Sequence, residues 1–251
     1  MITLQAFCEY LRSFLQPSLF ADYCPNGLQV EGTPSISRFA TAVSASCHVI
    51  EEAIKHDVQA LIVHHGIFWN RDSYVIEGVK KKKIEMLLSH GISLIAYHLP
   101  LDAHQSVGNN WKAAKDLGWG NLLPFCMING IPLGVKGEFH PVKVQEFQKQ
   151  LEMYYRHPAT VALGGKDLVT SAALISGGAY KNISDAIIAG VDCYVTGNYD
   201  EPAWHIAKEE NINFFALGHS ATERVGPSAL MEYLIKNLHL EGVFIDEENP
   251  F

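Results

Sequence analysis

Short apolar runs that alternate with amphipathic helical patterns are the feature that most constrains the fold of this 251-residue chain. Continuous apolar runs of this length are typical of strands that helices cover on both faces of a parallel sheet. The expected strands are 38–45, 59–63, 92–97, 171–176, 191–195 and 212–217. The expected helices are 48–57, 79–90, 110–117, 142–155, 181–189, 202–210 and 227–239. Because the two kinds of element alternate, we predict an α/β protein with mostly parallel sheets.

Two stretches of the chain repeat one order of elements. Residues 42–66 and residues 173–198 each contain a strand, a turn of small residues, a helix, a second strand and a polar turn. Each continues into a helix and a further strand that ends with a histidine, His98 or His219, and a carboxylate follows four residues later. The alternative is that any two βαβ stretches look alike at this level of detail. The ordered match of the elements favours two similar lobes.

The length of the chain is compatible with this division, because 251 residues can form one large domain or two small lobes. Hydrophobic residues make up 48% of the chain, which is enough for a sizeable core. We predict two similar three-layer α/β lobes. The first comprises residues 1–123 and is completed by the C-terminal segment 227–251, and the second comprises residues 124–226.

Two adjacent histidines, His64 and His65, follow a buried apolar run and precede Gly66. Neighbouring side chains of a strand point to opposite faces. Both imidazoles can therefore face one site only where the strand ends and the backbone turns, and Gly66 permits such a turn. Ligands bind at the carboxyl ends of strands in open parallel sheets. A site is therefore expected here, although a structural role is the alternative for any single histidine.

Carboxylates follow the two other strands that end in histidine. Asp102 lies in the segment YHLPLDAH, where a loop or helix-cap role is the alternative, and His104 of the same segment is expected to be an exposed loop residue. Glu223 follows His219 by four residues, which places both on neighbouring sides of one helical turn. The alternative for Glu223 is a capping box with Ser220. We favour the ligand role for Glu223.

Together these strand ends offer more donors than one metal ion uses. A single ion that keeps an open position rarely takes more than three or four protein groups, whereas five or six donors suit two ions about 3.5–4 Å apart that share a carboxylate. Mixed imidazole and carboxylate donors fit zinc, iron, manganese, nickel or cobalt. We predict two divalent ions at these strand ends, held by His64, His65, Asp102, His219 and Glu223. His98 is the candidate catalytic residue, as an acid, base or orienting group.

Charge, cysteine content and the N-terminal pattern exclude several classes of protein. The formal charge of −8 disfavours nucleic-acid binding, and the basic run Lys80–Lys83 is expected to be a solvated helix start. An odd number of cysteines without CxxC spacing disfavours a disulfide framework or a thiolate zinc site. The N-terminal pattern is an amphipathic helix ended by Pro17, and no apolar stretch approaches the roughly 18 residues of a membrane span. We expect a cytoplasmic protein.

Other common catalytic motifs do not occur in the sequence. There is no GxGxxG after a strand, no GxxxxGK[ST] loop and no GxSxG elbow, and no serine stands out as the nucleophile of a triad. The pairs Gly164-Gly165 and Gly177-Gly178 are expected to form turns rather than phosphate-binding loops.

Four segments of the sequence resemble the NIF-three-like family, whose bacterial members are often labelled GTP cyclohydrolase I type 2 homologues. These are DYCPNGLQVEG (22–32), LIVHHGIFW (61–69), YHLPLDAH with GNN (97–110) and GHSATERVG (218–226). The resemblance spans nearly the whole chain and implies two α/β lobes, a dinuclear metal centre between them, and a ring-shaped homohexamer that is a trimer of dimers. For the 22–32 segment it implies a place near the dimer interface or the site, and a Pro-Asn-Gly turn is the alternative.

The resemblance also implies ligand assignments and a function. His64, Asp102 and Glu223 would serve one metal, and His65 and His219 the other, with Glu223 bridging. The expected function is a metal-dependent hydrolase that opens a purine nucleotide, at C8 for GTP, or acts on a related phosphorylated small molecule. The alternative is a non-catalytic, metal-stabilised hexameric scaffold or a regulatory protein that binds partners. DNA binding through the ring is a third hypothesis, against which the charge of −8 argues.

Overall fold

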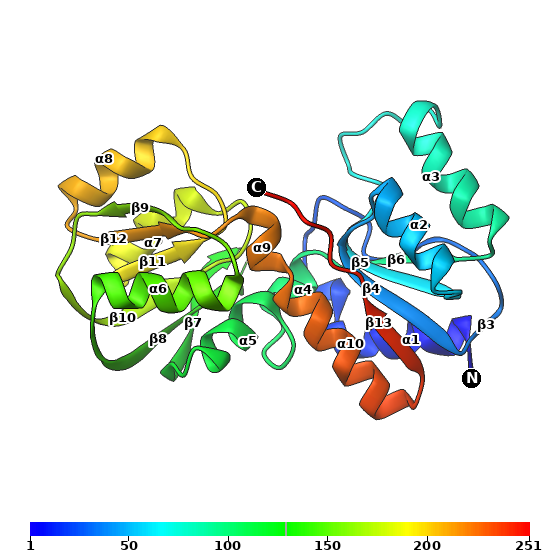
Figure 1. Cartoon of the computed structure of the whole chain (residues 1–251), viewed down its shortest axis with the longest axis horizontal. Helices are drawn as coiled ribbons and strands as arrows, with labels where there is room; N and C mark the ends of the chain where they lie inside the picture. Colours follow the sequence, from blue (N-terminus) through cyan, green and yellow to red (C-terminus); the bar gives the residue numbers. More distant parts are fainter. Residues whose placement is uncertain (129) are drawn as a thin grey trace. The chain divides into compact units, whose positions relative to one another are not determined.

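The computed structural model describes residues 1–128 and 130–251, and it divides the chain into two compact units. Unit 1 comprises Met1–Leu101 and Gly226–Glu248, and unit 2 comprises Asp102–Val225 and Asn249–Phe251. Each unit is built on its own sheet, as Figure 1 shows. The chain is therefore an α/β protein with two sheet-based lobes.

The boundary between the units lies at residues 101 and 102, whereas the sequence analysis placed it at 123 and 124. The reason is that helix α5 (Asn109–Asp116) contributes Trp111 and Ala114 to the hydrophobic core of unit 2. Asp102 consequently belongs to unit 2 and not to the lobe that carries His64 and His65.

The sheet of unit 1 has five strands in the order β13-β4-β5-β6-β2. Four of them pair in parallel, β4 (Arg38–Ser44), β5 (Ala60–His65), β6 (Ser93–Ala96) and β13 (Glu241–Phe244). Strand β2 (Gly27–Val30) is antiparallel to β6, and the short strands β1 (Ile2–Thr3) and β3 (Ser35–Ile36) pair with each other. The strands predicted at 38–45, 59–63 and 92–97 are confirmed as parallel neighbours.

Helices cover both faces of this sheet because successive strand residues point in opposite directions. Ala40 and Ala42 of β4 belong to a core cluster with α2 (Cys47–Lys55) and α3 (Gly78–Ser89). On the other face, the Phe39 ring lies 5.9 Å from the Phe7 ring of α1 (Leu4–Leu15). Thr41 donates a hydrogen bond to the Pro227 carbonyl of α10 (Val225–Leu238). Figure 1 shows the resulting three layers.

The sheet of unit 2 has six strands in the order β7-β8-β10-β11-β12-β9. Strands β10 (Leu168–Leu174), β11 (Cys193–Thr196) and β12 (Asn213–Ala216) are parallel neighbours, as predicted. The hairpin of β7 (Gly120–Ile128) and β8 (Ile131–Lys143) and the edge strand β9 (Thr160–Leu163) add antiparallel pairings that the sequence analysis did not predict. Much of β7 and β8 is exposed, so these segments lack the continuous apolar runs of buried strands.

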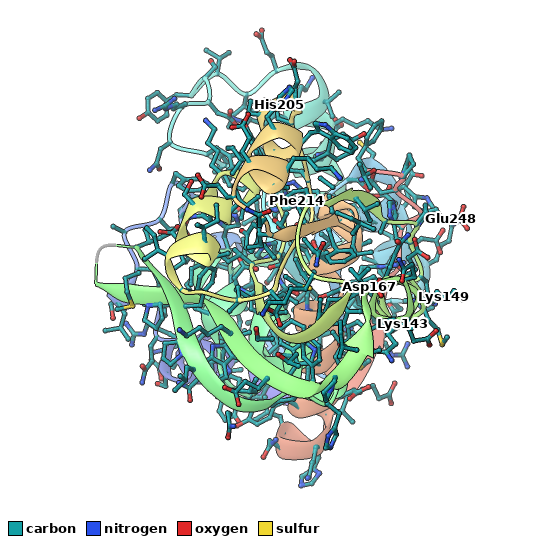
Figure 2. All side chains as sticks on the ribbon, turned by 90° about the vertical axis from the view of Figure 1, so that its left-hand side faces the viewer. Lys143, Lys149, Asp167, His205, Phe214 and Glu248 are labelled. Atoms are coloured by element: carbon teal, nitrogen blue, oxygen red, sulfur yellow. The ribbon has the colours of Figure 1, made fainter. Side chains whose placement is uncertain are left out.

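Helices also cover both faces of the second sheet. Helices α5 and α6 (Val144–Tyr155) pack with Val195 and Phe215 on one face. Helices α7 (Ile183–Ile188) and α8 (Glu201–Glu209) pack with Phe214 on the other. Figure 2 shows Phe214 inside the unit and His205 on the outer side of α8. Two short 3-10 helices, Pro17–Leu19 and Tyr180–Asn182, also occur. The remaining helices, α4 and α9, are described with the site below.

Both sheets contain the same central arrangement. Strands β4, β5 and β6 with the antiparallel β2 correspond to β10, β11 and β12 with the antiparallel β9. A short helix follows the third parallel strand in each unit, α4 (Leu99–Ala103) after β6 and α9 (His219–Glu223) after β12. The carboxyl ends of three adjacent parallel strands therefore meet at one edge of each sheet.

The five cysteines are free thiols. Within the described ranges, no helix combines the length and the apolar content that crossing a bilayer requires.

Phe215 tests the packing of unit 2, because its side chain is fully buried and its ring lies 5.5 Å from that of Phe147. We expect Phe215→Ala to lower the free energy of unfolding by about 3–5 kcal/mol, since it removes a large buried ring and leaves a cavity. Phe251→Ala is the matched control, because that ring is 80% exposed; its effect should stay within about 0.5 kcal/mol. Urea unfolding followed by circular dichroism measures both, and equal losses would contradict the assigned core.

Candidate metal centre

Three histidines of unit 1 lie together at the carboxyl ends of two neighbouring parallel strands. His64 and His65 end β5, and His98 follows β6 by two residues. The ring centroids are 4.6 Å apart for His64 and His65, and 4.9 Å apart for His64 and His98. One ring nitrogen of each residue lies within 4.8 Å of the others. His64 is fully buried and His65 is half-buried. The predicted grouping at strand ends is therefore present within this unit.

Two of these histidines are oriented by a hydrogen bond at Nδ1. His64 Nδ1 lies 3.2 Å from the carbonyl oxygen of Tyr97, which can only accept, so this nitrogen carries the proton. His65 Nδ1 lies 3.0 Å from the Ser44 hydroxyl at the end of β4. A partner at one nitrogen fixes the ring and leaves the other as the donor to a cation, which is the usual arrangement around metal-binding histidines.

The glycine after the two histidines has a different role from the one predicted. Gly66 is not among the residues with positive φ, so the turn does not depend on the conformational freedom of glycine. A Cβ atom at this position would instead lie 2.2 Å from Oε1 of Gln29. That oxygen accepts a hydrogen bond from the amide of Ile67 at 2.9 Å. The absence of a side chain at Gly66 therefore lets Gln29 hold the backbone that follows the histidines.

His98 is held by a carboxylate. Its Nδ1 lies 2.9 Å from Oδ1 of Asp22, whose side chain is only 2% exposed. Oδ2 of Asp22 accepts hydrogen bonds from Asn26 Nδ2 at 2.9 Å and from the Leu99 amide at 3.0 Å. Burial by itself raises the pKa of Asp22, but the hydrogen bonds from His98, Asn26 and Leu99 outweigh it and lower the pKa to about 2. The 22–32 segment therefore contributes an ionised carboxylate that orients His98, whereas the alternative Pro-Asn-Gly turn is not formed, because Gly27 begins β2.

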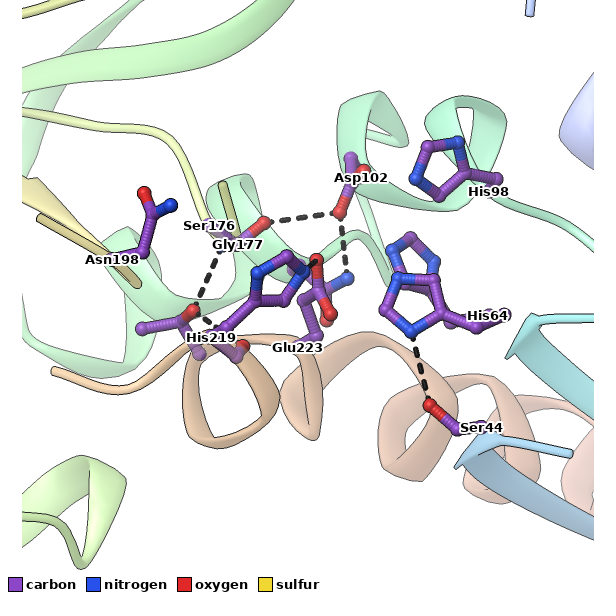
Figure 3. A network of polar contacts seen from close by, with 12 residues as sticks. Ser44, His64, His98, Asp102, Ser176, Gly177, Asn198, His219 and Glu223 are labelled. Carbon is purple, nitrogen blue, oxygen red and sulfur yellow. Dashed lines mark hydrogen bonds and ion pairs between the residues drawn. The ribbon is translucent and has the colours of Figure 1, made fainter. Parts of the chain in front are cut away.

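In unit 2, Asp102 lies on α4 with its carboxylate almost completely buried, at 5% exposure. Its Oδ1 accepts hydrogen bonds from Asn109 Nδ2 at 2.8 Å and from the Ser176 hydroxyl at 3.0 Å. Figure 3 shows the contact with Ser176, which follows the end of β10. Because burial of a carboxylate is costly, these donors stabilise the ionised form in a fixed orientation.

His219 and Glu223 occupy the first and last positions of α9. Nε2 of His219 lies 3.1 Å from Oε1 of Glu223, whose side chain is 3% exposed. The N-cap residue of α9 is Gly218, and no side chain caps the helix, so the alternative capping box of Ser220 and Glu223 is wrong. Carboxylate oxygens of Asp102 and Glu223 lie within 4.8 Å of one another. Two nearly buried carboxylates at this distance favour a cation between them.

Gly177 makes room for the Glu223 carboxylate. Its φ angle is +66°, and a Cβ atom built there would lie 2.1 Å from Glu223 Oε1. The Gly177 amide donates to the Thr222 hydroxyl at 2.9 Å, and its carbonyl accepts from the amides of Gly197 and Asn198. The glycine pair forms a turn, as predicted. The structure adds that this turn is packed directly against a predicted metal ligand.

The structure thus groups the predicted residues by unit: His64, His65 and His98 in unit 1, and Asp102, His219 and Glu223 in unit 2. His104 lies in a loop, as expected, but it is half-buried rather than exposed, and its Nδ1 accepts a hydrogen bond from the amide of Ser106. The sequence analysis missed the orienting residues Ser44, Asp22, Asn109 and Ser176. Ser44 and Ser176 could have been found from their positions at the ends of the first parallel strands.

Comparison with known proteins relates the whole chain to one family. The model of Duf34/NIF3 (NGG1p interacting factor 3) matches residues 2–250. A Chlamydia pneumoniae protein named GTP cyclohydrolase 1 type 2 homolog is 50% identical, with 97% of each chain covered. A Pseudomonas aeruginosa protein of the same name is 40% identical, with 99% of each covered. A solved structure described as protein ybgI of unknown function shares 36% identity and a TM-score of 0.94 over 100% of both chains.

The space at Gly177 is tested by Gly177→Ala, with Gly190→Ala as the matched control. The two glycines have φ angles of +66° and +68°, but nothing lies within 4 Å of a Cβ atom at Gly190. Both variants carry the strain of a left-handed alanine, about 1 kcal/mol. We expect Gly177→Ala to lose a further ~1–3 kcal/mol, because its methyl group displaces the Glu223 carboxylate. Urea unfolding measures the difference, and equal losses in both variants would refute the role of Gly177.

The Asp22 network predicts a specific loss of stability in acid. The folded-state pKa of about 2 lies below the ordinary value of 3.8, so the ionised carboxylate stabilises the fold above pH 4, and this contribution disappears as the pH falls through 2. We expect Asp22→Asn to cost about 2 kcal/mol at pH 6 and progressively less toward pH 2. Asp167→Asn, at an exposed carboxylate labelled in Figure 2, is the control. A loss from Asp22→Asn that does not change with pH would contradict the network.

Proposed function

Because this chain belongs to the Duf34/NIF3 family, we propose that it binds two divalent metal ions and hydrolyses a purine nucleotide or a related phosphorylated small molecule. One observation carries the proposal: each unit presents buried or half-buried imidazole and carboxylate groups at the carboxyl ends of parallel strands, several of them already oriented by a partner. The name GTP cyclohydrolase 1 type 2 homolog, which the relatives carry, supports a nucleotide as the substrate class.

The donor set fits two cations of the kind that accept nitrogen and oxygen ligands. In the proposal His64, Asp102 and Glu223 hold one ion, and His65 and His219 hold the other, with Glu223 shared. Zinc, iron, manganese, nickel and cobalt all suit these ligands. Such a pair would supply Lewis acidity and would lower the pKa of bound water toward neutrality. The near-buried carboxylates of Asp102 and Glu223 support this assignment, because a cation offsets their mutual repulsion.

The task of His98 in this proposal is proton transfer. Its Nδ1 donates to Asp22 Oδ1, so Nε2 holds the lone pair that can accept a proton from water or from the substrate. Asp22 is a positioning residue, because it fixes the tautomer and stabilises the imidazolium that forms. The arrangement resembles the carboxylate–histidine pairs that orient general bases in hydrolases.

The proposal includes a cytoplasmic homohexamer, a trimer of dimers, as the functional form. The alternative function is a metal-stabilised scaffold or regulatory protein without catalysis. The two differ in what the metal does: in the enzyme it serves turnover, and in the scaffold it holds the assembly together.

His65→Ala tests the metal centre, and His205→Ala on the exposed side of α8 is the matched control. We expect His65→Ala to lose at least one of two bound ions, because an imidazole donor with a fixed orientation is removed, while His205→Ala keeps both. Plasma mass spectrometry of the purified proteins measures the metal content. Full occupancy in His65→Ala would overturn the assignment.

Turnover and assembly of the same variants separate the enzyme from the scaffold. Hydrolysis of GTP and a panel of nucleotides by the metal-loaded protein, lost in His65→Ala while light scattering shows an intact hexamer, supports the enzyme. Dissociation of the hexamer in His65→Ala, with no hydrolysis by the unaltered protein, supports the scaffold and contradicts the proposed activity.

A further inference from the structure

A cavity of about 310 Å³ lies in unit 1 beside the segment that follows the two adjacent histidines. Trp69 forms part of its wall and also contacts the histidine cluster. The Trp69 ring centroid is 5.4 Å from that of His98, with the rings nearly perpendicular at 85°, and 5.8 Å from that of His65. A molecule in this cavity would therefore contact a side chain that also packs against His65 and His98.

Backbone hydrogen bonds hold the wall of the cavity in place. The Asn70 amide donates to the Tyr23 carbonyl at 2.9 Å, and the Asp72 amide donates to the Trp69 carbonyl at 3.0 Å. Tyr23 directly follows Asp22, which orients His98, and the Tyr23 ring lies 5.1 Å from that of His98. The cavity wall and the proposed proton-transfer residue are thus tied to the same short segment.

The lining favours an aromatic ring. Phe68, Trp69 and Tyr74 line the cavity, and the Tyr74 side chain is 97% exposed. An exposed tyrosine ring that lines a cavity, together with a tryptophan in its wall, offers flat apolar surfaces to a planar ligand. The volume is at the lower end of the roughly 300–1,000 Å³ of small-molecule sites, which fits a ring system better than a whole nucleoside triphosphate.

The charges of the lining disfavour a phosphate group. Nζ of Lys80 donates to the Ser73 carbonyl at 2.9 Å and lies 4.0 Å from Asp72 Oδ2. The same ammonium group lies 5.3 Å from the centre of the Phe68 ring. Its charge is therefore engaged by the cavity wall, and the Asp72 carboxylate would repel an anion. A carboxylate accepts hydrogen bonds, so it suits a ligand that carries N–H donors.

We propose that this cavity binds the planar nitrogen heterocycle of the substrate, with the rings of Trp69 and Tyr74 contacting its faces and Asp72 accepting from its N–H groups. The phosphate-bearing end lies outside the cavity. The inference rests on the proposed function, because it assigns the ring specificity of that nucleotide hydrolase to the segment 68–80.

Calorimetric titration of the full-length protein, metal-loaded and metal-depleted, tests the inference with guanosine, guanosine monophosphate and ribose 5-phosphate as probes. We expect guanosine and its monophosphate to bind with similar affinity, and ribose 5-phosphate not to bind at this cavity. Trp69→Ala and Tyr74→Ala should each weaken guanosine binding about ten-fold, since stacking on an aromatic residue contributes about 1–3 kcal/mol per base. Trp69→Phe should restore most of the affinity. Trp204→Ala on α8, 52% exposed and outside the cavity, should bind as the unaltered protein does.

Tyr74→Ala decides the case if Trp69→Ala disturbs the fold, because the exposed Tyr74 ring can be removed without opening the core. Guanosine binding that is unchanged in both Tyr74→Ala and Trp69→Ala overturns the proposal, as does ribose 5-phosphate binding as tightly as guanosine monophosphate. Binding that depends on Tyr74 without any hydrolysis supports the cavity and refutes the hydrolase. Hydrolysis with an unchanged KM in both alanine variants supports the hydrolase and refutes the cavity.

Discussion

Parallel pairing of three adjacent strands is the constraint on which the candidate site depends in each unit. In unit 1, the register that sets Ser44 opposite His65, and Val63 opposite Ala96, brings the ends of β4, β5 and β6 to one edge. A shift of one residue would turn His64 and the apolar residues before it to the other face of the sheet. The buried Ala40, Ala42 and Phe39 therefore fix the histidines indirectly, because they require the observed register.

The buried carboxylates differ in what compensates for their lost hydration. Nearly buried carboxylates are costly unless donors or cations compensate for lost hydration. Asp22 is compensated by hydrogen-bond donors from its own segment and from His98, so it can remain ionised without a metal. Asp102 and Glu223 lie close to each other, and their mutual repulsion makes them the natural place for a cation. These carboxylates thus divide into one that orients an imidazole and two that suit metal ions.

The sequence was informative where the chemistry is local. Continuous apolar runs identified β5 and β6. The histidines were then predicted to lie at the carboxyl ends of these strands because they directly follow the apolar runs. The four-residue spacing of His219 and Glu223 predicted their contact, because both lie on one helical turn. The β7–β8 hairpin was missed because half-exposed strands interrupted by Pro124 and Pro132 have no clear period.

Contacts between distant segments could not be predicted in the same way. The hydrogen bond from His98 to Asp22 spans 76 residues, and that from Ser176 to Asp102 spans 74. No periodicity encodes such a pairing, since it depends on how loops at strand ends are placed. The boundary between the units was predicted at residues 123 and 124 for a related reason. The pattern around Trp111 and Ala114 predicts an amphipathic helix, but it does not indicate which of the two sheets that helix covers.

The two units share one strand order, but the histidine that follows the third parallel strand has a different partner in each. In both, a histidine follows the third parallel strand and a short helix carries a carboxylate. His219 contacts the carboxylate of its own helix, whereas His98 contacts Asp22 from a distant segment. The carboxylate on the helix that follows His98, Asp102, instead accepts hydrogen bonds from Asn109 and Ser176. The Asp22 carboxylate therefore orients the His98 ring in unit 1. The difference between the two histidines therefore arises from the 22–26 segment, which unit 1 adds to an otherwise common arrangement and which also anchors the wall of the aromatic cavity.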